Sequence, residues 1–261
     1  MDDRYRVLHP LGEGTFSQIF KAVDTYVGKD VAVKVLNHGC ELLGRREGQY
    51  IQYMNRKNIR GSRYFIKLLD MFYFDDHVCL TLELFKSTLI NFIQMPLPPS
   101  APETVFDENV KRPIARSSYA FRTCPSSSGN SHGLNTIDKL RKIALKIISA
   151  LCLLKKEQII HADIKPENIF LTWDDTAHVQ LQKECALHST VYNLSDLPEN
   201  FDVRIGDFGS AIQTSETSEY YELFDIQTLS YRAPEVVLLF LFTPCVVFLY
   251  IIRRYPTLSI V

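Results

Sequence analysis

The first ninety residues alternate short apolar runs with turn-forming residues, a pattern typical of β-strands. Residues 5–36 predict a strand, a glycine-rich turn and two further strands, of which 31–35 is the best candidate for a buried strand. Residues 41–55 predict a helix, although two glycines weaken the pattern. Two more apolar runs, 65–74 and 78–85, predict strands joined by a polar turn. We therefore expect a five-stranded sheet with one helix in this part of the chain.

The composition changes after this region. Residues 95–135 hold six of the twelve prolines and seven serines, so they bury too little apolar surface to offset the entropy lost on ordering. We predict a disordered insertion here. A proline-rich docking ligand is the alternative, although no P-x-x-P repeat is sustained. A helix follows, because apolar residues recur at steps of three and four from Ile137 to Leu154. A second polar stretch at about 174–202 predicts another loop.

A glycine-rich segment and a lysine near the N-terminus indicate a phosphate site. The segment Leu11–Ile19 contains Gly12 and Gly14, and glycine lets a backbone turn tightly and bring its N–H groups close to phosphate oxygens. By itself this pattern is weak, because any tight hairpin produces it. Lys34, however, lies within the predicted buried strand, where its ammonium is costly unless it meets an anion. A phosphate or a carboxylate would serve, and Glu47 on the predicted helix is the best carboxylate candidate.

Two polar motifs further along carry candidate catalytic and metal-binding residues. In the loop from His161 to Asn168, Asp163 could accept a proton from an attacking hydroxyl group and Lys165 could neutralise a migrating phosphoryl group. Asn168 could ligate a metal ion. In the sequence Asp-Phe-Gly, the carboxylate of Asp207 on a glycine-hinged turn could hold Mg²⁺. Taken singly, each motif could equally be an ordinary surface loop.

Together and in this order, the motifs resemble the signature set of eukaryotic protein kinases. The match runs from Gly12 to Glu235 and includes VAVK, HADIKPEN, DFG and APE. Lys165, two residues after Asp163, resembles the serine/threonine class. HADIKPEN, DFGSA and YRAPEV resemble the branch of the CMGC group that contains pre-mRNA-processing kinases and dual-specificity tyrosine-regulated kinases. The resemblance implies an α+β, bilobal fold and ATP-dependent transfer of the γ-phosphate to serine or threonine hydroxyl groups of proteins.

The resemblance also implies how ATP is bound. Lys34 would bind the α- and β-phosphates and pair with Glu47, and Leu82 would be the gatekeeper beside the adenine. Ser17 stands where a third glycine is common. The remaining ATP-binding positions lie in the glycine-rich loop, the third strand and the hinge between the lobes: Leu11, Gly12, Glu13, Gly14, Thr15, Phe16, Ser17, Ile19, Ala32, Glu83, Leu84 and Phe85.

The catalytic and metal-binding roles follow from the same resemblance. Asp163 would be the catalytic base, with Lys165 and Lys34 as the other catalytic residues. Asn168 and Asp207 would hold Mg²⁺. Family members transfer the phosphoryl group through a loose transition state, so most of the catalysis is positioning and charge neutralisation.

Two departures from the family pattern concern the activation segment, residues 207–235. Ala162 replaces the arginine that in many kinases pairs with a phosphorylated activation segment, as it does in the HADIKP-type relatives. Asp225 stands where related kinases carry a regulatory tyrosine, and Leu229 replaces a neighbouring arginine. A fixed carboxylate together with lost arginines predicts that this segment is ordered without tyrosine phosphorylation. A polar surface loop with incidental hydroxyl groups, Thr228 among them, is the alternative.

The end of the chain departs most from the family pattern. After Ala-Pro-Glu a kinase continues with a D-x-W-S-x-G helix, whereas here an apolar run, 236–252, leads to two arginines, and the only tryptophan is Trp173. The run is short for a membrane span, and Pro244 interrupts it. A membrane anchor, a substitute for missing core helices, and a non-native tail from a truncated or mis-spliced reading frame all stay open.

Three regions follow from these patterns. We expect a β-rich kinase N-lobe and hinge at 5–85, an incomplete α-helical C-lobe at 86–235, and a hydrophobic tail unlike any kinase segment at 236–261. The intact motifs favour an active enzyme, and the truncated C-lobe favours the alternative. That alternative is a catalytically inactive fragment or pseudokinase that binds ATP or a partner.

Charge and cysteine content restrict the class of protein. The formal net charge of −1 removes the electrostatic case for direct binding to nucleic acid. The six cysteines are scattered without a C-x-x-C pair, which favours reduced thiols in an intracellular protein, and the N-terminus has no apolar signal region. We expect a monomer in the nucleus or cytoplasm that acts on protein substrates, without membrane association, although the tail is apolar.

Overall fold

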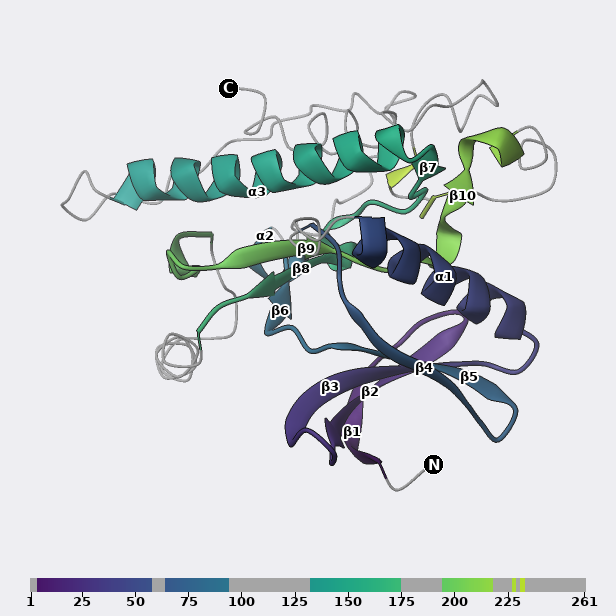
Figure 1. Cartoon of the computed structure of the whole chain (residues 1–261). Coiled ribbons are helices and arrows are strands. Elements are labelled where there is room, and N and C mark those ends of the chain that lie inside the picture. Colours follow the sequence, from purple (N-terminus) through teal and green to yellow (C-terminus); the bar gives the residue numbers. More distant parts are fainter. Residues whose placement is uncertain are drawn as a thin grey trace, which may run out of the picture.

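The computed structural model describes six stretches of the chain: 4–57, 64–93, 132–174, 194–217, 227–228 and 231–232. Within them, a β-rich lobe and a helical lobe lie against each other (Figure 1). One continuous hydrophobic core runs from Ile51 in the first helix through Phe65 and Phe208 to Leu154 in the long helix. The two lobes are therefore packed together, and the segments that cross between them are placed by that core.

The β-rich lobe is a five-stranded antiparallel sheet with one helix against it, as the sequence predicts. The strand order is β1-β2-β3-β5-β4. The elements are β1 (Tyr5–Glu13), β2 (Ser17–Asp24), β3 (Lys29–Leu36), α1 (Glu41–Lys57), β4 (Leu68–Phe74) and β5 (His77–Glu83). The strand predicted from residue 65 begins three residues later, because Phe65 forms a bridge to Ile205 and Ile66 donates its N–H to the same residue. That short stretch therefore joins the helical lobe instead of the sheet.

The two glycines that weaken the helix pattern in α1 are where the helix approaches the sheet most closely. A Cβ atom on Gly44 would lie 2.6 Å from Cγ of Leu36, and one on Gly48 would lie 2.8 Å from Sδ of Met71. Contacts shorter than about 3 Å are not tolerated in a packed interior. Both glycines thus lower helix propensity but let α1 lie close enough to β3, β4 and β5 to carry Glu47 into the interior.

The helical lobe is built on one long helix and short strands. The helices are α2 (Ile90–Ile93) and α3 (His132–Lys156), and the strands are β6 (Ser87–Thr88), β7 (Ile159–Ile160), β8 (Ile169–Thr172), β9 (Asp202–Ile205) and β10 (Ile212–Gln213). β10 pairs with β7, and β6, β8 and β9 form a second small sheet. The inward face of α3 includes Ile143, Ile147 and Leu154. It matches the predicted apolar stripe only in part, because Ile137, where that stripe begins, is 51% exposed.

The predicted end of the insertion is wrong. α3 begins at His132, inside the stretch 95–135 that composition assigned to an insertion, because a compositional window cannot locate a helix start. The second predicted loop, about 174–202, ends where β9 begins at Asp202, as expected. Within its described part, Leu197 and Phe201 are nevertheless buried. Because polar residues flank both of them in the sequence, their burial was not evident from the hydrophobic pattern.

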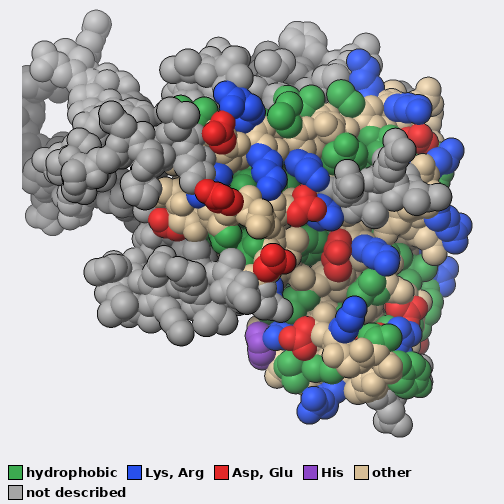
Figure 2. Space-filling view, turned by 60° about the vertical axis from the view of Figure 1, so that its left-hand side comes forward, with side chains coloured by type: hydrophobic (Ala, Val, Ile, Leu, Met, Phe, Trp, Pro, Cys, Tyr) green, Lys and Arg blue, Asp and Glu red, His purple; other side chains and the backbone are tan. Residues whose placement is uncertain are grey.

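Several expectations concern positions outside the described residues. These are the rest of the insertion and of the second loop, Asp225, Leu229 and the tail 236–261. In the part of the chain that the structure does describe, no helix is both long and apolar enough to cross a membrane. Figure 2 shows one face of the molecule, on which acidic and basic side chains are interspersed among hydrophobic ones. This mixing agrees with the balanced charge of the sequence.

Candidate active site

Lys34 is the buried centre of the site. Its strand, β3, pairs with β2 and β5, so that Lys34 lies opposite Ile19 on one side and Leu80 on the other. The side chain is 9% exposed, and its Nζ lies 2.8 Å from a carboxylate oxygen of Glu47 and 2.8 Å from Oδ1 of Asp207. Burial alone would lower the pKa of Lys34, but the two carboxylates outweigh it and raise the pKa. The predicted contact with Glu47 is present, and Asp207 is a second partner that the sequence did not indicate.

Glu47 connects α1 to the Asp-Phe-Gly turn. Its side chain is 2% exposed and accepts a hydrogen bond from Lys34 and another from the backbone N–H of Phe208. Burial raises the pKa of Glu47, whereas Lys34 favours its ionised form. The helix, the strand and the turn therefore share one carboxylate, so the position of α1 determines whether Lys34 is paired.

The Asp-Phe-Gly turn points its carboxylate at the lysine because its phenylalanine is anchored in the core. Phe208 is fully buried and packs edge-on against Phe65 and against the ring of His161. Asp207 adopts the left-handed conformation, with φ of 63°, which turns its side chain away from that anchor. Burial disfavours its charge, but the ammonium of Lys34 overcomes this and lowers the pKa of Asp207. The carboxylate is ionised at neutral pH and 37% exposed.

The loop after β7 is held by a buried histidine. His161 accepts a hydrogen bond from the backbone N–H of Asp163 at its Nδ1 (3.3 Å), so its Nε2 carries the proton donated to the carbonyl oxygen of Gly206 (3.0 Å). Burial lowers the pKa of His161, which agrees with a neutral ring. Ala162 takes a left-handed φ of 61°. The histidine thereby ties the loop to the strand that leads into Asp207.

The carboxylate of Asp163 is surrounded by four donor groups of three residues, from two parts of the chain. Its Oδ2 lies 2.8 Å from Nζ of Lys165 and 3.1 Å from Nδ2 of Asn168. Its Oδ1 accepts hydrogen bonds from Oγ1 of Thr228 (2.7 Å) and from the backbone N–H of Thr228 (3.1 Å). Lys165 also donates to Oγ1 of Thr228 at 2.8 Å. The three residues predicted from the short loop are thus gathered around one carboxylate.

Thr228 is the residue that the sequence reasoning missed. In the sequence it is one of several hydroxyl residues in a polar segment, and it lies 65 positions from Asp163. Its distance in sequence from the loop His161–Asn168 therefore gives no indication that the two are in contact. In the structure, a single threonine links the far end of that segment to Asp163 and Lys165. Sequence reasoning could have found it only by knowing how the segment folds back.

The glycine-rich segment forms the predicted turn, between β1 and β2. Neither Gly12 nor Gly14 adopts a left-handed conformation. Gly14 donates its N–H to the carbonyl oxygen of Ser17 at 2.8 Å, which closes the turn between β1 and β2. Ser17 is buried, while Leu11 and Phe16 are exposed on the turn. A Cβ atom on Gly12 would meet nothing within 4 Å, and one on Gly14 would lie 3.7 Å from the carbonyl oxygen of Ser17. Neither the backbone conformation nor the neighbouring residues therefore require glycine at these two positions.

The predicted adenine side lies at the end of β5. Leu82 is buried opposite Ala32 in the register of β3 and β5. Glu83 is the last residue of β5. Its backbone N–H donates to the carbonyl oxygen of Lys67, and its carboxylate accepts the backbone N–H of Lys67 at 2.8 Å. Burial raises the pKa of Glu83. Leu84 and Phe85 follow at the passage into the helical lobe. All three predicted hinge residues thus lie where the chain crosses between the lobes.

The oxygen atoms at this site fit a magnesium ion shared with phosphate groups. Asp207 offers a partly exposed, ionised carboxylate, and Asn168 offers an amide oxygen from the neighbouring loop. Magnesium prefers hard oxygen ligands and is commonly held by one or two protein groups together with phosphates. Among the described residues, no cluster of three or more histidine, cysteine or acidic side chains could hold a metal by itself. A two-ligand site that depends on phosphate is consistent with that arrangement.

Comparison with known proteins agrees with the geometry. The model of the protein kinase domain family matches residues 5–241. The chain is 27% identical to the dual specificity protein kinase YAK1 of Saccharomyces cerevisiae, 27% identical to the human dual specificity protein kinase CLK1, and 28% identical to the serine/threonine-protein kinase ppk15 of Schizosaccharomyces pombe. Each match covers 90% of this chain but only 22%, 40% and 33% of those proteins, respectively.

Proposed function

The chain belongs to the protein kinase family, and we propose that it transfers the γ-phosphate of ATP to serine and threonine hydroxyl groups of proteins. The observation that carries the proposal is the position of Lys34, which binds Glu47 and Asp207 at once although Asp207 is 173 residues away in sequence. Three separate motifs thereby meet at one buried cation. An ion pair that only stabilised the fold would need Lys34 and one carboxylate, but not a second carboxylate from the Asp-Phe-Gly turn.

In the proposed mechanism, Asp207 and Asn168 would hold a magnesium ion, which would supply neutralisation of the negative charge of the phosphate groups. Lys34, kept protonated by its two carboxylate partners, would bind phosphate oxygens of ATP. Asp163 would accept the proton of the attacking hydroxyl group, and Lys165 beside it would neutralise charge on the transferred phosphoryl group. Each of these side chains is already held by neighbours, so little reorganisation precedes the reaction.

The preference for serine and threonine is supported by the contact between Thr228 and the catalytic loop. The hydroxyl group of Thr228 bonds to both Asp163 and Lys165, so the activation segment lies close to the base. Lys165, which the sequence resemblance associates with the serine/threonine class, is thereby held between the base and that segment. One of the similar proteins is named a serine/threonine kinase, and two are named dual specificity kinases.

The alternative is a protein that binds Mg·ATP without turnover. Two measurements on the same sample separate the two functions: the rise in unfolding temperature with Mg·ATP, and phosphorylation of a serine- and threonine-containing peptide library. An active kinase shows both effects, and an inactive binder shows only the first.

Asp163→Asn tests the proposed base directly. We expect its peptide turnover to fall by about 10²–10⁴-fold while Mg·ATP still stabilises the fold, because Asp163 acts on the hydroxyl group and not on the nucleotide. Lys29→Met, on an exposed position of the same strand as Lys34, is the control that should match the parent. Turnover by Asp163→Asn at the parent rate would refute the assignment of the base.

A further inference from the structure

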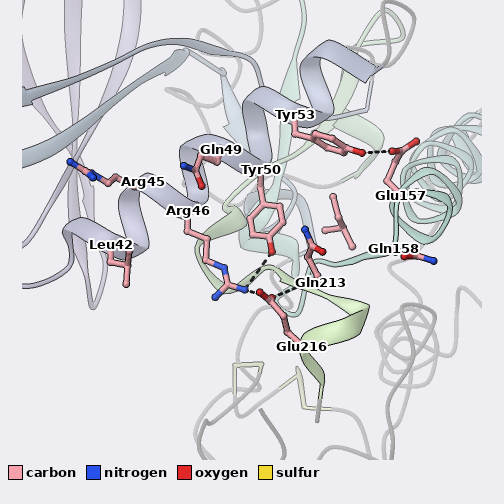
Figure 3. Close-up of a pocket in the computed structure, with 11 residues that line it drawn as sticks. Leu42, Arg45, Arg46, Gln49, Tyr50, Tyr53, Glu157, Gln158, Gln213 and Glu216 are labelled. Atoms are coloured by element: carbon pink, nitrogen blue, oxygen red, sulfur yellow. Dashed lines mark hydrogen bonds and ion pairs between the residues drawn. The ribbon is translucent and has the colours of Figure 1, made fainter. Parts of the chain in front are cut away.

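A groove of about 760 Å³ lies between α1 and the helical lobe (Figure 3). None of the predicted ATP-binding residues lines it. Its walls come from α1, from the end of α3 and from the β10 segment. The groove is crossed by a contact between Arg46 of α1 and Glu216, which lies in the 3₁₀ turn after β10. Figure 3 shows the two side chains pointing toward each other across the groove.

Glu216 is fixed on its own side before it meets Arg46. Its Oε2 accepts the backbone N–H of Gln213 at 2.9 Å, as part of a capping box that closes the turn. The strand before the turn is paired with β7 through Ile212 and Ile160. The carboxylate that Arg46 reaches is therefore part of the helical lobe, held by backbone contacts independent of α1.

Arg46 is fixed on the other side by its helix. It forms an ion pair with Glu216, and its guanidinium also donates to the hydroxyl group of Tyr50 (3.4 Å), one turn further along α1. The next residue in the helix is Glu47, whose carboxylate binds Lys34. Because a helix moves as a rigid unit, a rotation or shift of α1 that separates Arg46 from Glu216 also displaces Glu47.

From this arrangement we infer that Arg46 and Glu216 form a latch that holds α1 where Glu47 can bind Lys34. Glu216 is thus a positioning residue: it affects ATP binding through α1, without itself contacting Lys34. The inference rests on the proposed function of the Lys34 site. Both charges are present in the unmodified sequence, so this latch closes without a phosphate group on the activation segment.

A second contact between α1 and the helical lobe limits how much the loss of the latch can weaken Mg·ATP binding. At the far end of the groove, Tyr53 of α1 donates to Glu157 at 2.8 Å. Without the latch, α1 therefore pivots instead of detaching. Arg46 and Glu216 are 30% and 37% exposed, and partly exposed ion pairs shift an equilibrium by about two- to fivefold. We expect a change of that size in the dissociation constant of Mg·ATP.

The test uses Glu216→Gln in the full chain, which removes the charge but keeps the shape. Mg·ATP binding should weaken about two- to fivefold at low salt. The ratio of variant to parent should approach one at about 1 M salt, where charges are screened beyond about 3 Å. Arg46→Gln should weaken binding by a similar factor, and the double variant Arg46→Gln with Glu216→Gln should bind no more weakly than either single variant. Asp138→Asn removes an exposed ion pair with Arg141 on α3 and is the matched control.

The outcomes separate the latch from the proposed function. Equal binding by Glu216→Gln and the parent at low salt overturns the latch. Losses that simply add up in the double variant also overturn it, because the two residues would then act independently of each other. If the parent binds no Mg·ATP, the proposed function fails, and hydrogen exchange without nucleotide decides the latch. Faster exchange of the α1 amides in Glu216→Gln than in Asp138→Asn supports it, and equal exchange refutes it.

Discussion

Replacing Lys34 with methionine separates the structural contribution of this lysine from its role in ATP binding. Methionine fills a similar volume, so the main effect is the loss of a buried cation between two carboxylates. Glu47 is 2% exposed and would be left without its counter-ion. Removing one partner of a buried ion pair typically costs about 3–5 kcal/mol. Asp207 is 37% exposed and can gain water in compensation, so we expect the lower end of that range.

A second route gives a similar magnitude. Without Lys34, Glu47 can stay buried only as the neutral acid, because burial already raises its pKa in the parent protein. Holding a carboxyl group protonated at pH 7, against an ordinary pKa of about 4.3, costs about 3–4 kcal/mol. Because the folded state then binds a proton more tightly than the unfolded state, this loss is largest at pH 7. It diminishes as the pH falls toward the ordinary carboxyl pKa.

The assay is urea unfolding of the parent, Lys34→Met and Lys29→Met at pH 7 and pH 5. We expect Lys34→Met to lose about 3 kcal/mol at pH 7, visibly less at pH 5, and to bind no Mg·ATP productively. The double variant Lys34→Met with Glu47→Gln should recover most of the stability but none of the nucleotide binding. A Lys34→Met protein as stable as the parent at pH 7, or a loss that does not depend on pH, would refute the reasoning.

Two further predictions concern the turn and the helix. Asp207→Ala removes a proposed magnesium ligand and a partner of Lys34, so Mg·ATP binding should weaken about tenfold or more; a magnesium titration identical to that of the parent would contradict that role. Gly44→Ala raises helix propensity by about 1 kcal/mol, but its Cβ would lie 2.6 Å from Cγ of Leu36. We therefore expect a net loss of about 1 kcal/mol in urea unfolding, and a gain would show that α1 can move away from β3 without cost.

Much of the candidate site could be predicted because its motifs are local. The alternation of apolar and polar residues indicated the five strands and α1, and a lysine within a buried strand required an anion nearby. The loop from His161 to Asn168 is short, so its polar residues were bound to lie close together. The partnership of Lys34 with Glu47 followed from the same reasoning, because the helix comes directly after the strand. Local spacing was sufficient for all of these inferences.

Contacts between distant parts of the chain could not be predicted in this way. The ion pair between Lys34 and Asp207 spans 173 positions, and the hydrogen bond between Thr228 and Asp163 spans 65. Neither distance leaves a periodic signal. The glycines of α1 were interpreted as evidence against a helix, whereas they are the places where the helix touches the sheet. Only the packed neighbours show why a side chain is excluded there.

The sequence by itself therefore predicted the five strands of the β-rich lobe, the helices α1 and α3, and the acidic partner of Lys34. Each depends on residues near in sequence, whose geometry is fixed by the periods of strands and helices. Tertiary structure alone decided that Asp207 shares Lys34, that Thr228 closes over Asp163, and that Arg46 meets Glu216 across the groove. These contacts form only after the hydrophobic core has brought the two lobes together, because no local rule specifies how far α1 lies from the Asp-Phe-Gly turn.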